Sequence, residues 1–374
     1  MNAHFELTHR ARRRFLTQSL AGAGAFALSH LLNEDGVARA DDPRVDPQRA
    51  TSPHARPRAR CCIYIYLEGG PSQMDLFDPK PALNQRDGEP LPESLAAKTQ
   101  FAFLQKDTAR LMGTPRTFRR YGECGMEFSN LLPHIAQCAD DITMIRSMQT
   151  DQFNHVPAQL LMNCGSALAG HPSVGSWLCY GLGSESKNLP AYVALVTAGR
   201  GVPGGSASWS SGFLPSNYSG VLFGNDGDSI PNLQDPAGIT REIQRTSIDA
   251  VVDFNRAHLE RTGDPELASR IRSYELAFRM QTAAPELVDL SGETQATLDL
   301  YGVNRHEPPI QSNRGGKGLF QTFSRNCLLA RRMIERGVRV VNIIHSSWDH
   351  HSNLDPEIQH NSLMVDQPIA ALLK

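Results

Sequence analysis

The feature that most constrains the fold is an uninterrupted apolar run at residues 61–67, which stops abruptly at the polar turn 68–72. A strand with one face in water alternates between apolar and polar residues, whereas a strand covered on both faces of a parallel sheet is apolar throughout. The run therefore predicts a central strand of a parallel sheet.

Strand-like and helix-like segments alternate along the rest of the chain. Further strands are predicted at 142–148, 191–196 and 338–344. Helices are predicted at 156–162, 174–182 and 320–336. Gly337 ends the last helix directly before its strand, as in the second half of a crossover. This alternation predicts an α/β fold with a doubly wound, mostly parallel sheet and helices on both faces.

Two segments interrupt the alternation. Residues 198–236 are rich in Gly, Ser, Pro and Asn, which predicts an insertion outside the core. Residues 237–260 and 264–282 carry apolar residues at helical spacing and predict a helical hairpin on the outside. The chain stops at Lys374 within an apolar-periodic stretch that has no capping residue. We therefore interpret the domain as C-terminally incomplete.

The first 60 residues are predicted to lie outside the domain, which occupies 61–374. Arg12 and Arg13 open an R-R-x-F-L sequence, and the apolar run 20–32 and an A-x-A site follow. These features predict a twin-arginine signal peptide at 1–40, recognised by the twin-arginine export machinery. The apolar run has 13 residues, against about 20 for a membrane span, so no stable span is expected after cleavage. Four prolines predict an extended linker at 41–60, and we expect a periplasmic or extracellular protein.

Composition and spacing exclude several classes of function. With 37 basic and 39 acidic residues the chain has no broad basic field for nucleic acid, so no nucleic-acid partner is expected. The Gly-rich segment 314–318 lacks the spacing of a nucleotide-binding loop, and 70–74 lacks the second glycine of a serine hydrolase elbow. The seven cysteines contain no C-x-x-C pair, and buried free thiols are expected.

Polar side chains gather directly after three of the predicted strands, at 68–81, 151–155 and 345–353. Because the carboxyl ends of parallel strands meet at one edge of a sheet, we expect these clusters to lie within about 10 Å of one another. Asp349 and His351 are a compact pair that can hold a divalent metal ion such as Zn, Mn, Mg or Ca. The alternative for each cluster is a simple turn or helix cap, which Asp and Asn also favour.

Several of these motifs together resemble a known family. They comprise 69–81, Asn154-His155, 163–165, 171–176 and 348–351. In this combination they resemble exported bacterial proteins of domain-of-unknown-function family 1501 over residues 61–374. The resemblance implies membership of the alkaline phosphatase and sulfatase superfamily, whose metal ions sit at the carboxyl edge of a doubly wound sheet.

The resemblance also implies roles for individual residues. In that superfamily the nucleophile opens a helix that ends at a Thr-Gly pair, and Cys164-Gly165 here leads back to His155, which Asn154 precedes. Imidazole can accept a phosphoryl group or act as a base, so His155 and Asn154 are the candidate catalytic residues.

The implied metal ligands are Asp75, Asp349 and His351, and the candidate substrate-binding residues are Ser72, Gln73, Lys80 and Trp348. The first acidic ligand of the superfamily falls at Glu68 or Gly69, and a later Asp-His segment falls beyond Lys374.

Two functions follow from this reading. One is an exported metal-dependent hydrolase of sulfate or phosphate esters, acting on a small-molecule or polysaccharide substrate. The other is a non-catalytic binding or assembly protein on the same fold, with a histidine in place of the nucleophile. They differ in whether the protein holds stoichiometric metal and turns over an ester.

Overall fold

The computed structural model describes residues 58–97, 105–197, 202–224, 238–310 and 319–374. The predicted signal peptide, the linker up to residue 57 and the Gly-rich segment 314–318 lie outside the described residues. None of the described helices is long and apolar enough to cross a membrane.

Four parallel strands form the central sheet. Their spatial order is β1 (Cys62–Leu67), β6 (Val340–His345), β4 (Tyr192–Thr197) and β5 (Val221–Phe223). β6 pairs with both β1 and β4, so that His345 lies beside Leu67 on one side and Thr197 on the other. The carboxyl ends of these three strands therefore meet at one edge of the sheet.

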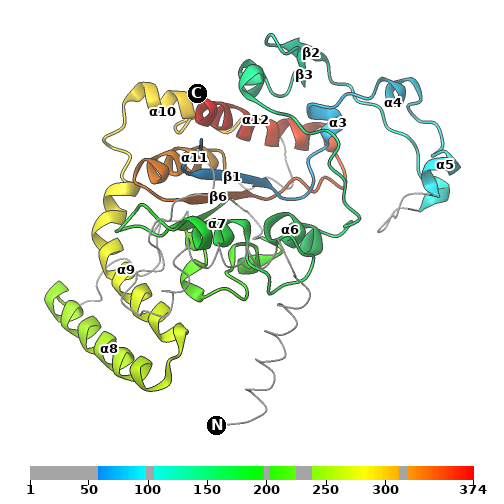
Figure 1. Cartoon of the computed structure of the whole chain (residues 1–374). Coiled ribbons are helices and arrows are strands. Elements are labelled where there is room, and N and C mark those ends of the chain that lie inside the picture. The colour runs from blue at the N-terminus through cyan, green and yellow to red at the C-terminus, as the bar shows by residue number, and fades with distance from the viewer. Residues whose placement is uncertain (1–57, 98–104, 198–201, 225–237, 311–318) are drawn as a thin grey trace, which may run out of the picture.

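Helices lie on both faces of this sheet, as Figure 1 shows. α11 (Leu319–Glu335) and α12 (Leu354–Leu373) lie on one face, and α6 (His155–Cys164) and α7 (Val174–Leu182) lie on the other. α11 is amphipathic and buries Phe323, Cys327 and Met333 in the larger of two hydrophobic clusters. The predicted mixed α/β fold with a mostly parallel sheet is confirmed.

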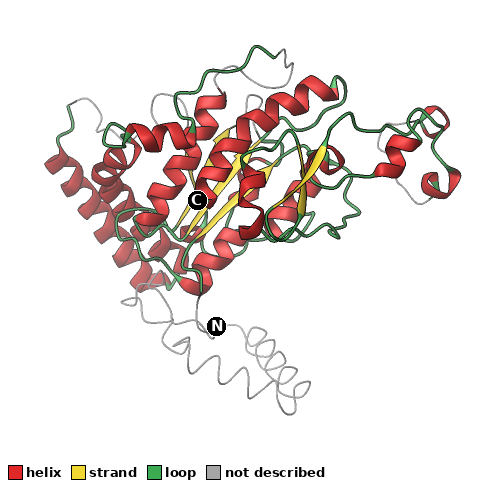
Figure 2. Cartoon of the chain, turned by 90° about the horizontal axis from the view of Figure 1, so that it is seen from above, coloured by secondary structure: helices red, strands yellow, loops and turns green. Residues whose placement is uncertain are grey.

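The remaining elements extend around this centre, and Figure 2 shows helices arranged on all sides of the strands. The short helices before the second sheet are α3 (Gln73–Leu76), α4 (Pro81–Gln85), α5 (Glu93–Ala96) and η2 (Lys106–Thr108). β2 (Phe118–Tyr121) and β3 (Met126–Ser129) form an antiparallel hairpin, which η3 (Ile135–Asp141) follows. Later 3-10 helices are η4 (Gly205–Trp209) and η5 (Ser216–Tyr218).

The predicted helical hairpin is confirmed. α8 (Arg241–Thr262) and α9 (Pro265–Val288) pack against each other, and α10 (Gln295–Tyr301) follows them. Thr240 caps the start of α8 and Asp264 caps the start of α9, each through a side-chain oxygen that accepts a backbone hydrogen bond. The hairpin projects from the sheet at the lower left of Figure 1.

One predicted strand, at 142–148, is wrong. The segment has no regular secondary structure, and the side chains of Ile145 and Met148 are 64% and 67% exposed. Only Ile142 and Met144 pack against the larger hydrophobic cluster. Ile142 and Met144 therefore cover the edge of the core from an irregular segment, with which no strand in the described part of the chain pairs.

Two further expectations need correction. β1 was expected at the centre of the sheet, but among the described residues it pairs with β6 alone, and its side chains are only partly buried. Residues 198–236 were expected to lie outside the core, but β5 extends the sheet and Trp209 and Tyr218 are buried. A three-residue strand is too short to show a period in a Gly- and Ser-rich segment.

All seven cysteines are free thiols. Cys138, Cys179 and Cys327 are buried, as the sequence predicts. Burial raises the pKa of Cys179 to about 12, which makes this thiol a poor nucleophile.

Candidate functional site

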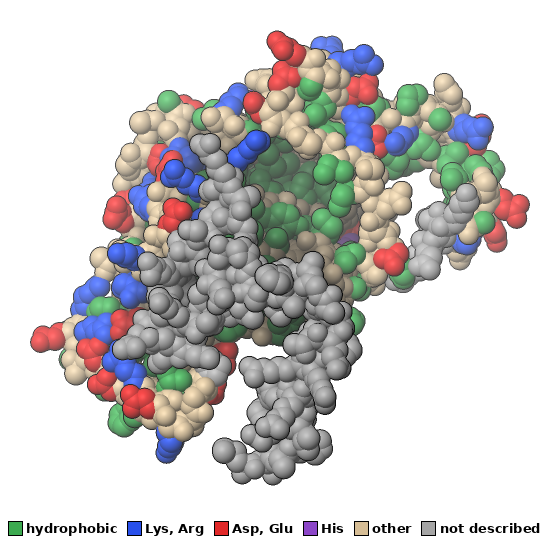
Figure 3. Space-filling view, in the orientation of Figure 1, with side chains coloured by type: hydrophobic (Ala, Val, Ile, Leu, Met, Phe, Trp, Pro, Cys, Tyr) green, Lys and Arg blue, Asp and Glu red, His purple; other side chains and the backbone are tan. Residues whose placement is uncertain are grey.

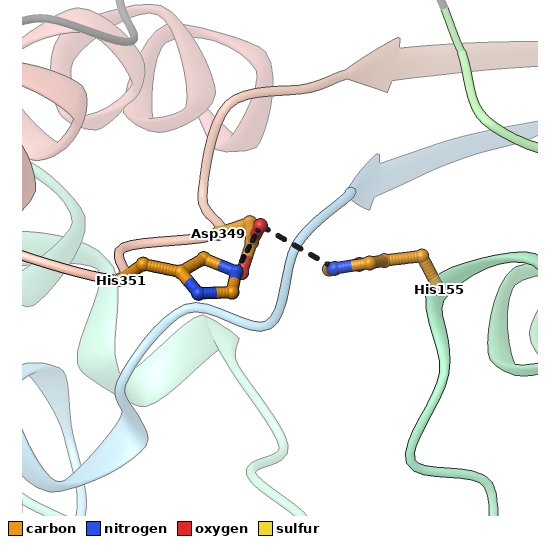
Figure 4. A group of neighbouring side chains, drawn as sticks. All are labelled: His155, Asp349 and His351. Carbon is orange, nitrogen blue, oxygen red and sulfur yellow. Dashed lines mark ion pairs between the residues drawn. The ribbon is translucent and has the colours of Figure 1, made fainter. Parts of the chain in front are cut away.

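Polar side chains from all three predicted clusters meet at the carboxyl edge of the sheet, where β6 ends and α6 begins. The Nε2 atom of His155 lies 3.4 Å from Oδ2 of Asp349, and the Nε2 atom of His351 lies 2.7 Å from the same oxygen. Figure 4 shows the two rings on opposite sides of the Asp349 carboxylate. His155 and His351 are 196 positions apart in the chain, and the parallel sheet brings them together.

The turn after β1 is fastened to the loop after β6 by backbone hydrogen bonds. The N–H of Glu68 donates to the carbonyl of His345 at 2.8 Å, and the N–H of Trp348 donates to the carbonyl of Glu68 at 3.0 Å. Gly69 has a φ of +112°, and a Cβ atom there would lie 2.2 Å from the backbone nitrogen of Asp349. Only glycine permits this approach of the two backbones.

α6 presents His155 in its first turn. Asn154 is the N-cap residue, and its exposed side chain makes no capping hydrogen bond. The hydroxyl of Tyr64 in β1 donates to the carbonyl of Met162 at 3.4 Å, which fastens the helix to the sheet. Gly165 ends the helix in the left-handed conformation, with a φ of +70°. The helix that the Cys164-Gly165 pair predicted is thus present, with His155 as its first residue.

The loop after β6 has an unusual backbone held by buried side chains. Ser347 has a φ of +89°, a region that non-glycine residues rarely adopt. The side-chain amide of Asn361 in α12 donates to the carbonyl of Ser347 at 2.7 Å. Trp348 is 1% exposed and its ring packs against the rings of His345 and His350. Strained backbone that buried groups hold in place is common at functional sites.

His155, Asp349 and His351 have the composition and spacing of a metal site. One donor atom from each lies within 4.8 Å of the other two. Ligands on a tetrahedral zinc ion with bonds of about 2.0–2.1 Å are about 3.3 Å apart, so small side-chain rotations bring these donors onto one ion. The side chains are 42%, 30% and 58% exposed, which leaves room for a further ligand from solvent.

The model of the family described as "Protein of unknown function (DUF1501)" matches residues 59–374. The chain belongs to this family. No curated protein and no solved structure matches it.

A fourth side chain at this site is that of Glu68, which was not among the candidate metal, catalytic or substrate-binding residues but is one of the two positions at which the resemblance implies an acidic ligand. Its Oε1 atom lies 3.3 Å from Nδ1 of His155, and its side chain is 7% exposed. Its place immediately after an apolar strand is the sequence signal that points to it.

Asp75 lies outside the group of donors that His155, Asp349 and His351 form in this DUF1501 protein. Its carboxylate is buried and accepts hydrogen bonds from the hydroxyl of Ser72 at 2.6 Å and the hydroxyl of Thr114 at 2.5 Å. These bonds stabilise the turn into α3, so the turn alternative explains Asp75 and Ser72 better than metal or substrate binding does.

The other candidate substrate-binding residues lie in different surroundings. Gln73 is exposed at the start of α3. Lys80 is exposed and forms an ion pair with Asp78 at 2.8 Å. Trp348 is buried inside the loop that carries Asp349, where it supports the loop and is closed off from solvent.

Proposed function

We propose that this DUF1501 protein is an exported, metal-dependent hydrolase of sulfate or phosphate esters, built on an alkaline phosphatase-like variant of the α/β fold. The observation that carries the proposal is the group of two imidazoles and one carboxylate, His155, Asp349 and His351, with donors within 4.8 Å at the carboxyl edge of the sheet. In open α/β sheets this edge is where ligands bind.

The donor set favours zinc among the divalent metals. Mg²⁺ and Ca²⁺ prefer oxygen ligands, whereas imidazole nitrogens suit zinc and its neighbours among the transition metals. Two histidines and one carboxylate, with one position left for water or substrate, are also the ligand pattern of a catalytic zinc site. An ion held by His155, Asp349 and His351 would supply Lewis-acid chemistry, by polarising an ester oxygen and lowering the pKa of water at the site.

The chain's own groups would hold and orient the ester. His155 would bind the metal through Nε2. It therefore acts as a metal ligand, and not as the nucleophile that its position at the start of the helix implied. Asn154 precedes it with an exposed amide that can donate to an ester oxygen. The first turn of α6 adds the backbone N–H groups of His155 and Val156, which precede the first helical hydrogen bond, and the positive end of the helix dipole. Both favour an anionic sulfate or phosphate group.

The proposal is tested by metal content and ester hydrolysis measured on the same preparations. Wild-type protein should hold about one zinc per chain and hydrolyse p-nitrophenyl sulfate or p-nitrophenyl phosphate. Asp349→Asn and His351→Ala should lose the metal, and the rate should fall at least about a hundredfold. The matched controls are Asp253→Asn and His258→Ala, which change exposed residues of α8 and should alter neither quantity.

Metal-loaded protein that hydrolyses neither ester would overturn the hydrolase proposal. The chain would then be a metal-holding binding or assembly protein, the alternative function inferred from the sequence.

A further inference from the structure

The ring of His155 is held between two carboxylates. Its Nδ1 atom lies 3.3 Å from Oε1 of Glu68, and its Nε2 atom lies 3.4 Å from Oδ2 of Asp349. The two carboxylates differ in exposure, since the side chain of Glu68 is 7% exposed and that of Asp349 is 30% exposed. Asp349 also pairs with His351 at 2.7 Å.

A neutral imidazole has one N–H group and one lone pair, so it can donate to only one of these carboxylates. With the proton on Nε2, the lone pair of Nδ1 would face a carboxylate that is almost entirely removed from water, which is unfavourable. With the proton on Nδ1, the ring donates to Glu68, and the lone pair of Nε2 faces the space beside Asp349 and His351. The buried carboxylate therefore favours the tautomer that can bind a metal ion there.

Glu68 is also rigidly placed. Its backbone N–H donates to His345 and its carbonyl accepts from Trp348, so both bonds run to β6 and to the loop that carries Asp349. A carboxylate fixed in this way can set the angle of the His155 ring as well as its tautomer. The group of converging donors itself consists of His155, Asp349 and His351.

We propose that Glu68 is a positioning residue of the metal site, which accepts a hydrogen bond from Nδ1 of His155 and thereby presents Nε2 to a zinc ion without itself binding the ion. This inference rests on the proposed function and deepens it. Partners of this kind raise the basicity of a histidine ligand, and their removal typically costs 10–100-fold in metal affinity.

The test compares two substitutions of Glu68 by zinc affinity, measured by competition with a chromophoric chelator. Glu68→Ala removes the hydrogen-bond acceptor and should weaken zinc binding by about 10–100-fold. Glu68→Gln keeps an oxygen that can accept from Nδ1 but removes the charge. Because a charge-assisted bond is roughly twice as strong as a neutral one, this variant should lose about three- to tenfold.

A spectroscopic measurement separates positioning from general stability. Nitrogen-15 NMR of the zinc-loaded wild type should show the proton of His155 on Nδ1 and the metal on Nε2. In Glu68→Ala the Nδ1–H signal should shift, because its acceptor is gone, while the midpoint of urea unfolding measures any structural loss separately.

The chain offers a matched control in a second glutamate–histidine pair. Nε2 of the buried His360 lies 3.1 Å from Oε1 of Glu307. His360 is not in the donor group, so Glu307→Gln should leave zinc affinity and the His155 signals unchanged.

The outcomes distinguish this inference from the proposed function. If the wild type binds zinc and the zinc affinity of Glu68→Ala is within twofold of the wild-type value, the inference alone is overturned. It is also overturned if NMR shows that zinc binds His155 through Nδ1. If Glu68→Ala does not fold, Glu68→Gln decides by the same criterion. Wild type that binds no zinc overturns the proposed function and this inference together.

Discussion

Gly69→Ala should force apart the two loops that carry Glu68 and Asp349. The new Cβ atom would lie 2.2 Å from the nitrogen of Asp349 and 2.6 Å from the carbonyl carbon of Trp348. Relief of these overlaps needs a backbone shift of about 1 Å, which breaks the 3.0 Å hydrogen bond from Trp348 to Glu68. Overpacking of this kind costs about 1–3 kcal/mol, and a φ of +112° adds about 1–3 kcal/mol for a residue with a side chain.

The free energy of unfolding in urea should therefore fall by about 2–6 kcal/mol, and zinc affinity should fall by about a hundredfold, as expected when functional groups are misplaced by 1 Å. Gly70→Ala is the control. Its φ is +77°, but nothing lies within 4 Å of the added Cβ, so it should cost only about 1–2 kcal/mol and leave zinc affinity nearly unchanged. Equal effects of the two substitutions on zinc affinity would refute the argument that close contact between the loops builds the site.

Two further predictions concern pH and export. Burial lowers the pKa of His345 from 6.5 to about 4. The unfolded chain therefore binds a proton that the folded chain excludes, so stability present above about pH 6.5 should be lost as the pH falls towards 4, by up to about 3 kcal/mol. Between pH 7 and 4.5, the free energy of unfolding in urea should fall less for His345→Gln than for the wild type. An equal fall in both proteins would show that His345 is not the cause. The double substitution Arg12→Lys and Arg13→Lys should trap the precursor inside the cell. Unchanged export in a fractionation assay would exclude the twin-arginine route.

The sequence predicted the elements whose periodicity is long and regular. The helix predicted at 320–336 corresponds to α11, and the strand predicted at 338–344 overlaps β6, because a 17-residue amphipathic helix ending at a glycine has few alternative conformations. An apolar run shows that both faces of a strand avoid water, but it does not show which strands lie beside it. For that reason the apolar run predicts a central strand, whereas β1 is the edge strand of the sheet that the described residues form.

The site was predictable where chemistry and strand ends coincide. Asp349 and His351 directly follow the strand β6, as the sequence predicts. The strand predicted before His155 is wrong, so only the resemblance and the helix ending at Cys164-Gly165 lead to His155. Asp75 has the same residue type in a similar place, yet its carboxylate accepts a hydrogen bond from Ser72, three residues before it. Spacing alone does not separate these two uses of a carboxylate.

The contact between Glu68 and His155 joins residues 87 positions apart and depends on how α6 packs against β1. No local pattern encodes such a contact, since it arises from the packing of a helix on a sheet. The structure is therefore needed to recognise Glu68 as the partner of His155.

The central claim is that His155, Asp349 and His351 bind one metal ion together. Anomalous X-ray diffraction at the zinc absorption edge, on crystals of the zinc-loaded protein, measures this most directly. The account predicts one peak per chain, about 2.0–2.2 Å from Nε2 of His155, a carboxylate oxygen of Asp349 and a ring nitrogen of His351. A zinc-loaded crystal with no peak at this edge of the sheet, or with zinc bound only by other residues, would contradict it.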